Sequence, residues 1–546
     1  MQTTEDRAAG ALPVNDRAAE TAPSRPGLLA FTGTGPGDAG LLTLRAAELI
    51  GQADVVVGSA QLTARVAHLV PETAAVLETG QDGAGIAALI SAVQAGRIVV
   101  RLCPGDPLLF GQAAAEADAC ARAAIPLEIV PGMPAATAVP AYAGLPLTSD
   151  TTADMRVVHA SELSRGSAEF QAAGSLVILG AEAGPADLAK MLMAAGWADA
   201  TPMAITWNGT STDQHTVLTK LSSVAADLKA AGVSVLTEDG PAIAVIGEAA
   251  GHRGLSWFEN KPLFGWRVLV PRTKEQAASV SERLRSYGAV PQVVPTIAVE
   301  PPRAPQQMER AIKGLVTGRF QWIAFTSANA VRAVREKLED YGLDARAFAG
   351  IKVAAVGEQT AAALGEFGIK PDLVPPEAEQ SSEGLAAAWP PYDDVLDPIN
   401  RVLLPRADIA TETLVARLTE LGWETEDVTA YRTVRAAPPP APIREAIKGG
   451  GFDAVLFTSS STVRNLIGIA GKPHAVTAVA VIGPQTAQTA AEYGLRVDVT
   501  APRASATALV DALAEHGARL RDAALAAGEP VRRPSERRRG GRRRTR

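Results

Sequence analysis

The chain has 546 residues, enough for roughly three or four domains of about 150 residues each. Hydrophobic residues make up 47% and charged residues 20%, typical of a soluble globular protein, while aromatics at 4% disfavour base-stacking platforms for nucleic acid. Two cysteines and six scattered histidines exclude a disulfide framework and disfavour a metal site.

Residues 1–26 are rich in Ala, Thr, Glu and Pro without periodicity, so we expect them to be disordered. They lack the basic-then-apolar pattern of a signal peptide. No apolar run in the chain is long enough to span a bilayer. A cytoplasmic protein is expected.

From residue 27 to 255, apolar runs of strand length alternate with Ala/Leu/Glu-rich segments at helical spacing. This alternation predicts an α/β domain with buried, largely parallel strands. Its first turn, GTGPGD at 33–38, carries three glycines that let the backbone approach a ligand, and Asp38 can cap the next helix. The turn lacks the GxGxxG spacing of a dinucleotide fingerprint, and such turns are often purely structural.

Four more segments follow in order: VVRLCPGDPLLFG at 99–111, LEIVPGMPAATAVPAYAGLPLT at 127–148, TWNGTSTDQ at 206–214 and PAIAVIGEAA at 241–250. Together the five resemble the tetrapyrrole methylases, most closely uroporphyrinogen-III C-methyltransferase, over about 28–260. The resemblance implies two α/β lobes with S-adenosylmethionine in the cleft between them. The positions that match the family's cofactor contacts are Pro36, Pro104, Gly105, Asp106, Leu109, Pro134, Ala135, Gly180 and Gly209.

The chain departs from this family at four places. Pro104 replaces a glycine and removes one N–H donor, and Gly180 stands where the family has a methionine. Ser59 stands where the family has the aspartate that is its candidate base, and the basic loop expected next is shortened to ETGQDG at 78–83, without lysine. Serine without an adjacent base is a poor proton acceptor. A degenerate binding domain is therefore the alternative to an active methyltransferase.

The segment 256–265 is expected to be the linker, with Trp257, Phe258 and Phe264 packing against its surroundings. Beyond it the chain repeats itself. RVLVPR at 267–272 returns as RVLLPR at 401–406, an offset of 401 − 267 = 134, and FTSANAV at 325–331 returns as FTSSSTV at 457–463, an offset of 457 − 325 = 132. A period near 130 predicts two similar α/β lobes with paired loops lining a cleft.

This half resembles uroporphyrinogen-III synthase over about 264–518. The resemblance implies a synthase domain at 266–518 with flavodoxin-like parallel sheets. Because Pro-rich stretches lie near 300–306 and 436–443, we expect one lobe from 266–300 plus 436–518 and the other from 301–435. The resemblance implies that the domain closes hydroxymethylbilane to uroporphyrinogen III with inversion of ring D, without any cofactor.

Tyr431 is the candidate acid by resemblance; a buried tyrosine bonded to backbone is the alternative. Thr360 and Thr486, near helix starts in the two copies, are further catalytic candidates, with helix capping as the alternative. The candidate substrate-binding residues follow strand ends, where α/β folds bind ligands, although Arg272 and Arg406 could equally be ordinary surface arginines. They are Arg272, Ser327, Asn329, Arg406, Ser459 and Ser460.

These resemblances predict a fused enzyme of porphyrin biosynthesis that makes uroporphyrinogen III and methylates it with S-adenosylmethionine towards precorrin-2, on the siroheme and cobalamin branch. The alternative is a synthase whose methylase-like half only binds. A homodimer through the methylase-like domain is a candidate assembly. Residues 519–546 end in an Arg-rich segment, with nine Arg and one Glu after residue 531. We expect this tail to be disordered, and a nucleic-acid or lipid partner is the alternative.

Overall fold

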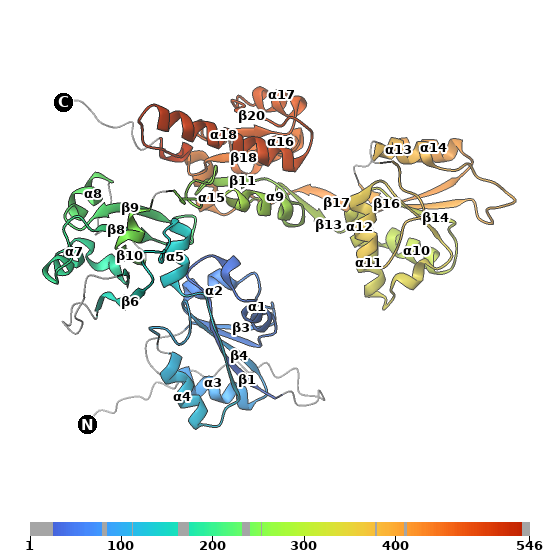
Figure 1. Ribbon diagram of the computed structural model, residues 1–546. Helices are drawn as coiled ribbons and strands as arrows, with labels where there is room; N and C mark the ends of the chain where they lie inside the picture. The colour runs from blue at the N-terminus through green and yellow to red at the C-terminus, as the bar shows by residue number, and fades with distance from the viewer. Residues whose placement is uncertain are drawn as a thin grey trace, which may run out of the picture. The chain divides into compact units, whose positions relative to one another are not determined.

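The computed structural model describes residues 26–78, 85–111, 113–161, 174–231, 241–252, 254–376, 379–408 and 412–537. Within these ranges the chain is an α/β protein with four five-stranded sheets (Figure 1). It divides into two compact units. The first ends at Gly265 and includes Tyr287–Ala289, whereas the second comprises Trp266–Ser286 and continues from Val290.

The first unit begins with a fully parallel sheet in the order β3-β2-β4-β1-β5. Helices pack on it, and buried apolar clusters lie on both of its faces, so its central strands read as continuous apolar runs. The strands are β1 (Leu28–Gly33), β2 (Val55–Gly58), β3 (Ala75–Glu78), β4 (Ile98–Cys103) and β5 (Leu127–Val130). The helices are α1 (Leu44–Gly51), α2 (Ala60–Val66), α3 (Gly85–Gln94) and α4 (Ala113–Arg122), with a 3-10 turn at Ala39–Leu41.

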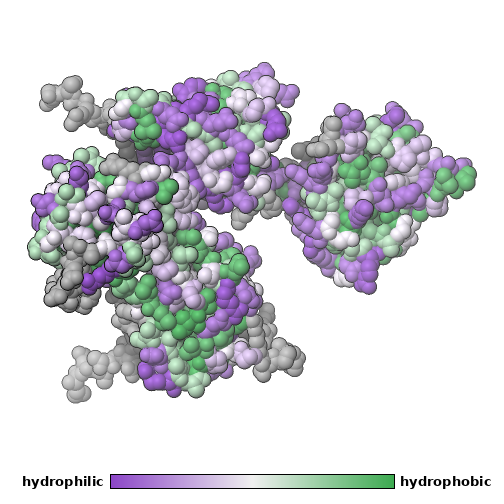
Figure 2. Space-filling model, viewed as in Figure 1, coloured by the Kyte–Doolittle hydropathy of each residue, from purple (hydrophilic) through white to green (hydrophobic). Residues whose placement is uncertain are grey.

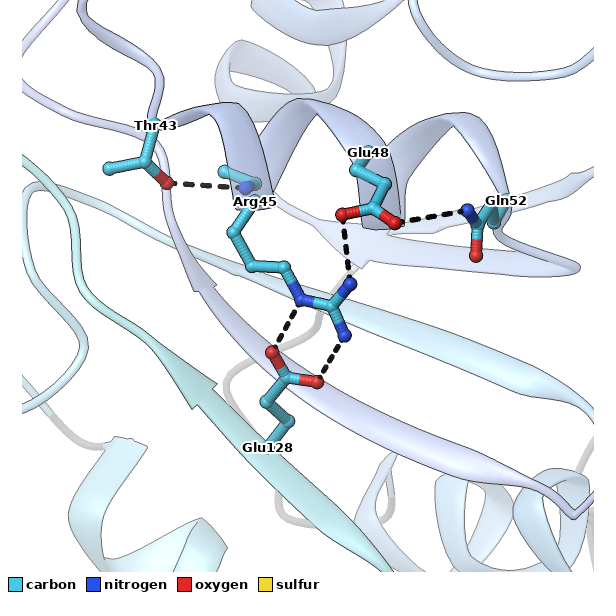
Figure 3. Close-up of polar contacts among 6 residues, drawn as sticks. Thr43, Arg45, Glu48, Gln52 and Glu128 are labelled. Atoms are coloured by element: carbon cyan, nitrogen blue, oxygen red, sulfur yellow. Dashed lines mark hydrogen bonds and ion pairs between the residues drawn. The ribbon is translucent and has the colours of Figure 1, made fainter.

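An ion pair ties α1 to β5 (Figure 3). The Nε and Nη2 atoms of Arg45 donate hydrogen bonds to the two carboxylate oxygens of Glu128, both at 2.7 Å. Nη1 of the same guanidinium donates to Glu48 at 2.9 Å. These bonds from Arg45 hold the pKa of Glu128 below its usual value. The pair is exposed, so we assign it to orientation of the helix rather than to a large gain in stability.

The second sheet of this unit is mixed, in the order β6-β7-β10-β8-β9. Only β6 and β7 are parallel, and the other three pairings are antiparallel. The expectation of largely parallel strands is therefore wrong for this lobe. Strands β7, β8 and β10 are almost fully buried, and a buried apolar run looks the same in either direction. The strands are β6 (Met155–His159), β7 (Ser175–Leu179), β8 (Pro202–Trp207), β9 (His215–Lys220) and β10 (Ala242–Ile246).

Helix α5 (Ala135–Ala143) packs on one face of this mixed sheet, within a cluster that includes Val139, Val177 and Val245. The predicted linker packs against its end. The indole N–H of Trp257 donates to the carbonyl of Ala141 at 3.0 Å. The remaining helices are α7 (Pro185–Ala194) and α8 (Val224–Ala230), with 3-10 turns at Ala181–Ala183 and Glu248–Gly251.

The second unit contains two sheets, and each sheet takes strands from both copies of the repeat. The sheet that we call sheet A is fully parallel, in the order β12-β11-β18-β19-β20. Its strands are β11 (Arg267–Val270), β12 (Val290–Val293), β18 (Ala454–Phe457), β19 (Ala478–Val481) and β20 (Val499–Thr500). Its helices are α9 (Lys274–Ser286), α15 (Ala441–Gly449), α16 (Ser460–Ala470), α17 (Pro484–Glu492) and α18 (Ala506–Ala526).

Sheet B has the order β13-β17-β16-β14-β15, and only β13 is antiparallel to its neighbour. Its strands are β13 (Ile297–Glu300), β14 (Trp322–Phe325), β15 (Lys352–Ala355), β16 (Arg401–Ala407) and β17 (Glu424–Arg435). Its helices are α10 (Pro305–Val316), α11 (Ala328–Asp340), α12 (Glu358–Glu366), α13 (Ser382–Ala388) and α14 (Thr413–Glu420), with a 3-10 turn at Ala345–Phe348.

Two expected boundaries differ from the structure. Residues 297–300, expected with sheet A, form β13 and pair with the end of β17 in sheet B. The tail expected to be disordered from 519 instead continues α18 to Ala526, and a 3-10 turn follows at Pro534–Glu536. Asp453, which is fully buried, accepts a hydrogen bond from the backbone N–H of Ser535 at 2.9 Å and so anchors this turn. Residues 538–546, like 1–25, lie outside the described ranges.

Among the described residues, no helix combines the length and apolar character needed to cross a membrane.

Candidate active sites

Three glycines, at or two residues beyond the carboxyl ends of β1, β4 and β5, touch through bare backbone. We call Gly33, Gly105 and Gly132 the glycine junction. A Cβ added to Gly132 would lie 2.0 Å from the carbonyl oxygen of Gly105, and one added to Gly33 would lie 2.5 Å from the Cα of Gly132. No side chain fits at Gly33 or Gly132, and at Gly105 a φ of +60° favours glycine. The carboxyl edge of this parallel sheet therefore presents backbone atoms, as α/β ligand sites do.

The two predicted turns at this edge are joined directly. Gly35 and Gly105 exchange backbone hydrogen bonds, Gly35 N–H to Gly105 O at 3.3 Å and Gly105 N–H to Gly35 O at 3.1 Å. Both have positive φ, +69° and +60°, which favours glycine. Pro36 and Pro104, both predicted cofactor contacts, flank this bridge.

Asp106 holds the junction together from the inside. One of its carboxylate oxygens accepts the N–H of Leu108 at 2.9 Å, and the other accepts the N–H of Gly132 at 3.1 Å. The carboxylate thus links the PGDP turn to the VPG turn. Leu109, by contrast, is 41% exposed beside Leu108 and Phe110, which are also exposed. Figure 2 shows that hydrophobic residues gather on the visible face of the lobe that contains β1–β5.

The other predicted cofactor residues surround α5. Pro134 is its N-cap residue and Ala135 its first residue. Gly209 lies against the helix, because a Cβ there would be 2.4 Å from Cγ1 of Val139. Gly180 follows β7, whose last residue, Leu179, belongs to the same apolar cluster as Ala135. The structure therefore brings Pro134, Ala135, Gly180 and Gly209 to one helix and its sheet.

Two hydrogen bonds connect the glycine-rich turn to the second lobe, and the sequence reasoning missed both partners. The N–H of Asp38 donates to Oγ1 of Thr210 at 3.0 Å, and Tyr142 donates its phenol to the Asp38 carboxylate at 2.9 Å. Burial and the neighbouring Asp38 raise the pKa of Tyr142, so it remains a donor. Tyr142 lies inside a quoted motif, but nothing in its spacing pointed to Asp38. Asp38 also caps the 3-10 turn at Ala39–Leu41, as expected.

Ser59 has a local structural role. It is the N-cap of α2, and its Oγ accepts the N–H of Leu62 at 3.4 Å. The shortened loop that should follow the family's base, 78–83, lies outside the described residues except for its first one. A pocket of about 480 Å³ opens at the far end of α5, but the residues that line it, such as Gly144, Leu255 and Trp257, include none of the predicted cofactor contacts.

In sheet A, Arg272 and Ser459 line one pocket of about 290 Å³. Among the described residues, no hydrogen-bond or ion-pair partner of the Arg272 guanidinium is found, and burial lowers its pKa. The sequence did not single out the other polar residues of this pocket. They are Thr273, Gln276, Thr296, Thr458, Ser461, Thr462 and Asn465.

Ser460 lies close to α17. Its hydroxyl donates to the carbonyl of Gln485 at 3.2 Å and accepts a hydrogen bond from Thr489 at 2.9 Å. Thr486 is buried within the first turn of α17. The N-cap of this helix is Gly483, without a side-chain bond, so helix capping is the wrong interpretation of Thr486.

In sheet B, Tyr431 and Ser327 meet. Their hydroxyl oxygens are 2.9 Å apart, and Tyr431 is 7% exposed. The partner is thus a side chain, not the backbone that the alternative required. Ser327 is also the N-cap of α11, with Asn329 in the first turn. Thr360 lies buried in the first turn of α12, whose N-cap is Gly357, so capping is the wrong interpretation here too.

Arg406, the counterpart of Arg272, is locked inside the protein. Its side chain is 5% exposed and forms ion pairs with Asp427 and Glu412. Nε donates to one oxygen of Asp427 at 2.6 Å, and Nη2 donates to the other. Asp427 raises the pKa of Arg406. The prediction of Arg406 as a substrate-binding residue, and its alternative of an ordinary surface arginine, are therefore both wrong, because protein carboxylates already bind its guanidinium.

Two family models match the chain. Residues 28–225 match the tetrapyrrole (corrin/porphyrin) methylases, and residues 278–511 match uroporphyrinogen-III synthase HemD. The porphyrin biosynthesis protein HemD of Ruminiclostridium josui is 31% identical over 508 residues, which cover 90% of this chain and 98% of that protein. The chain belongs to this family. It is a fused protein of tetrapyrrole biosynthesis, so the predicted fusion and α/β fold class are confirmed.

Other matches cover a smaller share of this chain. Siroheme synthase 1 of Klebsiella pneumoniae is 35% identical over 249 residues, 43% of this chain and 51% of that protein, so the chain spans about half the length of that relative. The solved structure of uroporphyrin-III C-methyl transferase from Thermus thermophilus, complexed with S-adenyl homocysteine, is 26% identical. It covers 41% of this chain and 99% of its own, with a TM-score of 0.35.

Proposed function

We propose that the chain closes hydroxymethylbilane to uroporphyrinogen III in its second unit and methylates uroporphyrinogen III towards precorrin-2 in its first. The observation that carries this proposal is that both family models match one chain, in the arrangement of a relative that it covers almost completely. The product of the first reaction is the substrate of the second, which gives the fusion a chemical rationale.

For ring closure, the substrate's C–O bond breaks and hydroxide leaves with the electron pair. Ring D attacks the azafulvenium cation left behind, through a spiro intermediate that inverts the ring. The final C–C bond closes the macrocycle with loss of a proton, so that water is lost overall. The proposed role of Tyr431 is to donate a hydrogen bond or proton to this leaving oxygen, and its 2.9 Å contact with the Ser327 hydroxyl, which can donate to the phenol oxygen, supports that role. Arg272, without a protein partner among the described residues, is the cation proposed to hold one of the substrate's eight carboxylates. Thr360 and Thr486 are proposed as hydroxyl donors from the two copies.

The first unit fits S-adenosylmethionine. The glycine junction leaves a carboxyl edge of bare backbone, and Leu109 and Phe110 offer exposed apolar surface beside it. The residues proposed to hold the cofactor are Pro36, Pro104, Gly105, Asp106, Pro134, Ala135, Gly180 and Gly209. Asp106 also links the two turns. The bound cofactor would supply an electrophilic methyl group.

A second function is favoured by Ser59. Because its hydroxyl caps α2 and no carboxylate stands in its place, we propose that the first unit binds the cofactor but methylates slowly. Loss of a general base typically costs about 10²–10⁴-fold in rate, and positioning supplies what remains. In the limiting case the chain acts only as a synthase, with a binding domain attached.

The test uses the full chain with hydroxymethylbilane, and chromatography of the uroporphyrinogen isomers formed. Type III product supports the synthase, whereas type I alone, as in the enzyme-free control, rejects it. The same reaction with S-adenosylmethionine is then followed for precorrin-2, alongside calorimetric titration with S-adenosylhomocysteine. Binding with slow turnover supports the proposed role of Ser59. Normal turnover shows that Ser59 is no handicap, and absence of binding leaves only a structural partner of the synthase.

A further inference from the structure

An imidazole fills the space in which the family carries a methionine. Gly180, at the end of β7, has φ +76°, and a Cβ there would lie 3.0 Å from both Cε1 and Nε2 of His159. Strands β6 and β7 run parallel with His159 beside Leu179, which sets the ring against Gly180. A longer side chain at position 180 would collide with this ring. The residues at positions 180 and 159 are therefore sterically coupled, because the imidazole occupies the space that a side chain at position 180 would need.

The orientation of the ring is set by Ser161. The backbone N–H of Ser161 donates to Nδ1 of His159 at 3.3 Å, and the Ser161 hydroxyl lies 2.9 Å from the same atom. A backbone N–H can only donate, so Nδ1 is the acceptor and the neutral ring carries its hydrogen on Nε2. The structure shows no partner for Nε2 among the residues it describes. Nε2, which faces Gly180, therefore carries an N–H that can donate to a ligand.

This donor lies on the face of the sheet that carries α5. Alternate residues of a strand share a face, so His159 lies on the same side as Val157. Val157 and Leu179 pack in one cluster with Ala135, the first residue of α5. Ala135 and Gly180 are both among the proposed cofactor contacts. His159, which neither the motifs nor the family resemblance singled out, therefore belongs to this group by position.

We propose that His159 is a cofactor-contact residue that takes the place of the family's methionine and donates a hydrogen bond from Nε2 to bound S-adenosylmethionine. The proposal rests on the cofactor binding proposed for the first unit. It explains why Gly180 is tolerated, since the space that its missing side chain leaves is filled from the neighbouring strand. It also adds a directed polar contact to a site otherwise built from backbone and small residues.

The test is calorimetric titration of the full chain with S-adenosylhomocysteine. One neutral hydrogen bond corresponds to a change in Kd of about tenfold, so His159→Ala should weaken binding by that factor. His159→Phe keeps a ring but not the donor, and should weaken binding equally. His68→Ala, at an exposed histidine of the other lobe, should leave the Kd unchanged.

The space exchange is tested by a double variant. Gly180→Met alone should lower both affinity and melting temperature, because its side chain meets the imidazole. Gly180→Met combined with His159→Ala should recover part of the melting temperature, because the clash with the ring is removed while the strain of a positive φ at position 180 remains. An unchanged Kd in His159→Ala beside normal wild-type binding overturns this proposal alone. Absence of binding by the wild-type chain overturns the proposed cofactor site, and this proposal with it. Equal melting temperatures of the single and double methionine variants would contradict the exchange.

Discussion

The two copies of the repeat diverge at the arginine that ends their shared RVL(V/L)PR strand. In sheet B, Leu404 of β16 is in register with Asp427 of β17, and Asp427 binds Arg406 two residues further on. In sheet A, the corresponding Val270 of β11 is in register with Val293 of β12. An apolar residue thus stands where the other copy has a carboxylate, which leaves Arg272 to the pocket.

This difference teaches that a repeated motif does not imply a repeated role. Arg406 forms ion pairs with carboxylates of its own lobe, whereas Arg272 is a candidate ligand-binding cation. The serine loops differ in the same way. Ser327 meets the phenol of Tyr431, whereas the Ser459 hydroxyl lies 2.8 Å from that of Ser461, in its own turn. We infer that sheet B supplies the donor and sheet A the cation.

The largest effect is expected from Tyr431→Phe, which removes the donor but keeps the ring in the core. We expect synthase turnover to fall by about 10²–10⁴-fold, with the free energy of unfolding lowered by only about 1 kcal/mol. Isomer analysis and calorimetric melting measure the two quantities. Ser327→Ala is the matched control: it breaks the same hydrogen bond but leaves the phenol. If both variants lose little turnover, the pair is structural only.

The next effect separates the two arginines. Arg272→Met should raise KM for hydroxymethylbilane about tenfold to a hundredfold, because a charge-assisted hydrogen bond contributes about 1.5–3 kcal/mol. Arg406→Met should leave KM unchanged and destabilise the chain, because it leaves Asp427 without its partner. Since Asp427 is 43% exposed, we expect a loss of about 1–2 kcal/mol, below the range for fully buried pairs. A KM effect of equal size in both variants would erase the distinction.

A smaller and more direct test converts one copy towards the other. Val293→Asp places a carboxylate across from Val270, as Asp427 stands across from Leu404. We expect it to pair with Arg272 and raise KM several-fold, by competition with a substrate carboxylate. Val293→Asn, of nearly the same size but uncharged, should have a much smaller effect. If the two variants behave alike, charge pairing does not control the pocket.

Much of this organisation could be predicted from the sequence. The apolar runs and the offset repeats gave the α/β class, and the serine loops were expected at strand ends, where Ser327 and Ser459 lie. The ion pair of Arg406 could not be predicted, because strand register decides which residue faces Asp427 and a register shift of one residue exchanges faces.

The methylase half shows the same limit. Its glycines were predicted from motifs, since positive φ and close backbone approach demand glycine at Gly35 and Gly105. Tyr142 and His159 were missed, because their partners, Asp38 and Gly180, are distant in sequence and come close only through the fold. The mixed second sheet was missed for the related reason that buried strands carry no signal of direction.

The smallest expected effect concerns a helix whose length differs between the two copies. After the last strand pairing of each copy, the chain continues into a helix. In sheet B this helix is α13, with seven residues, and in sheet A it is α18, with 21. His516 lies in the extra length of α18, and burial lowers its pKa.

The folded state thus takes up a proton on His516 at lower pH than the unfolded state does. Its contribution to stability is complete above the unfolded pKa of about 6.5 and is lost as pH falls below it. The melting temperature of His516→Gln should therefore fall less than that of the wild-type chain between pH 7.5 and 5.5, while His68→Gln should follow the wild type. Parallel pH profiles of all three proteins would show that the longer helix adds no proton-linked term to this copy.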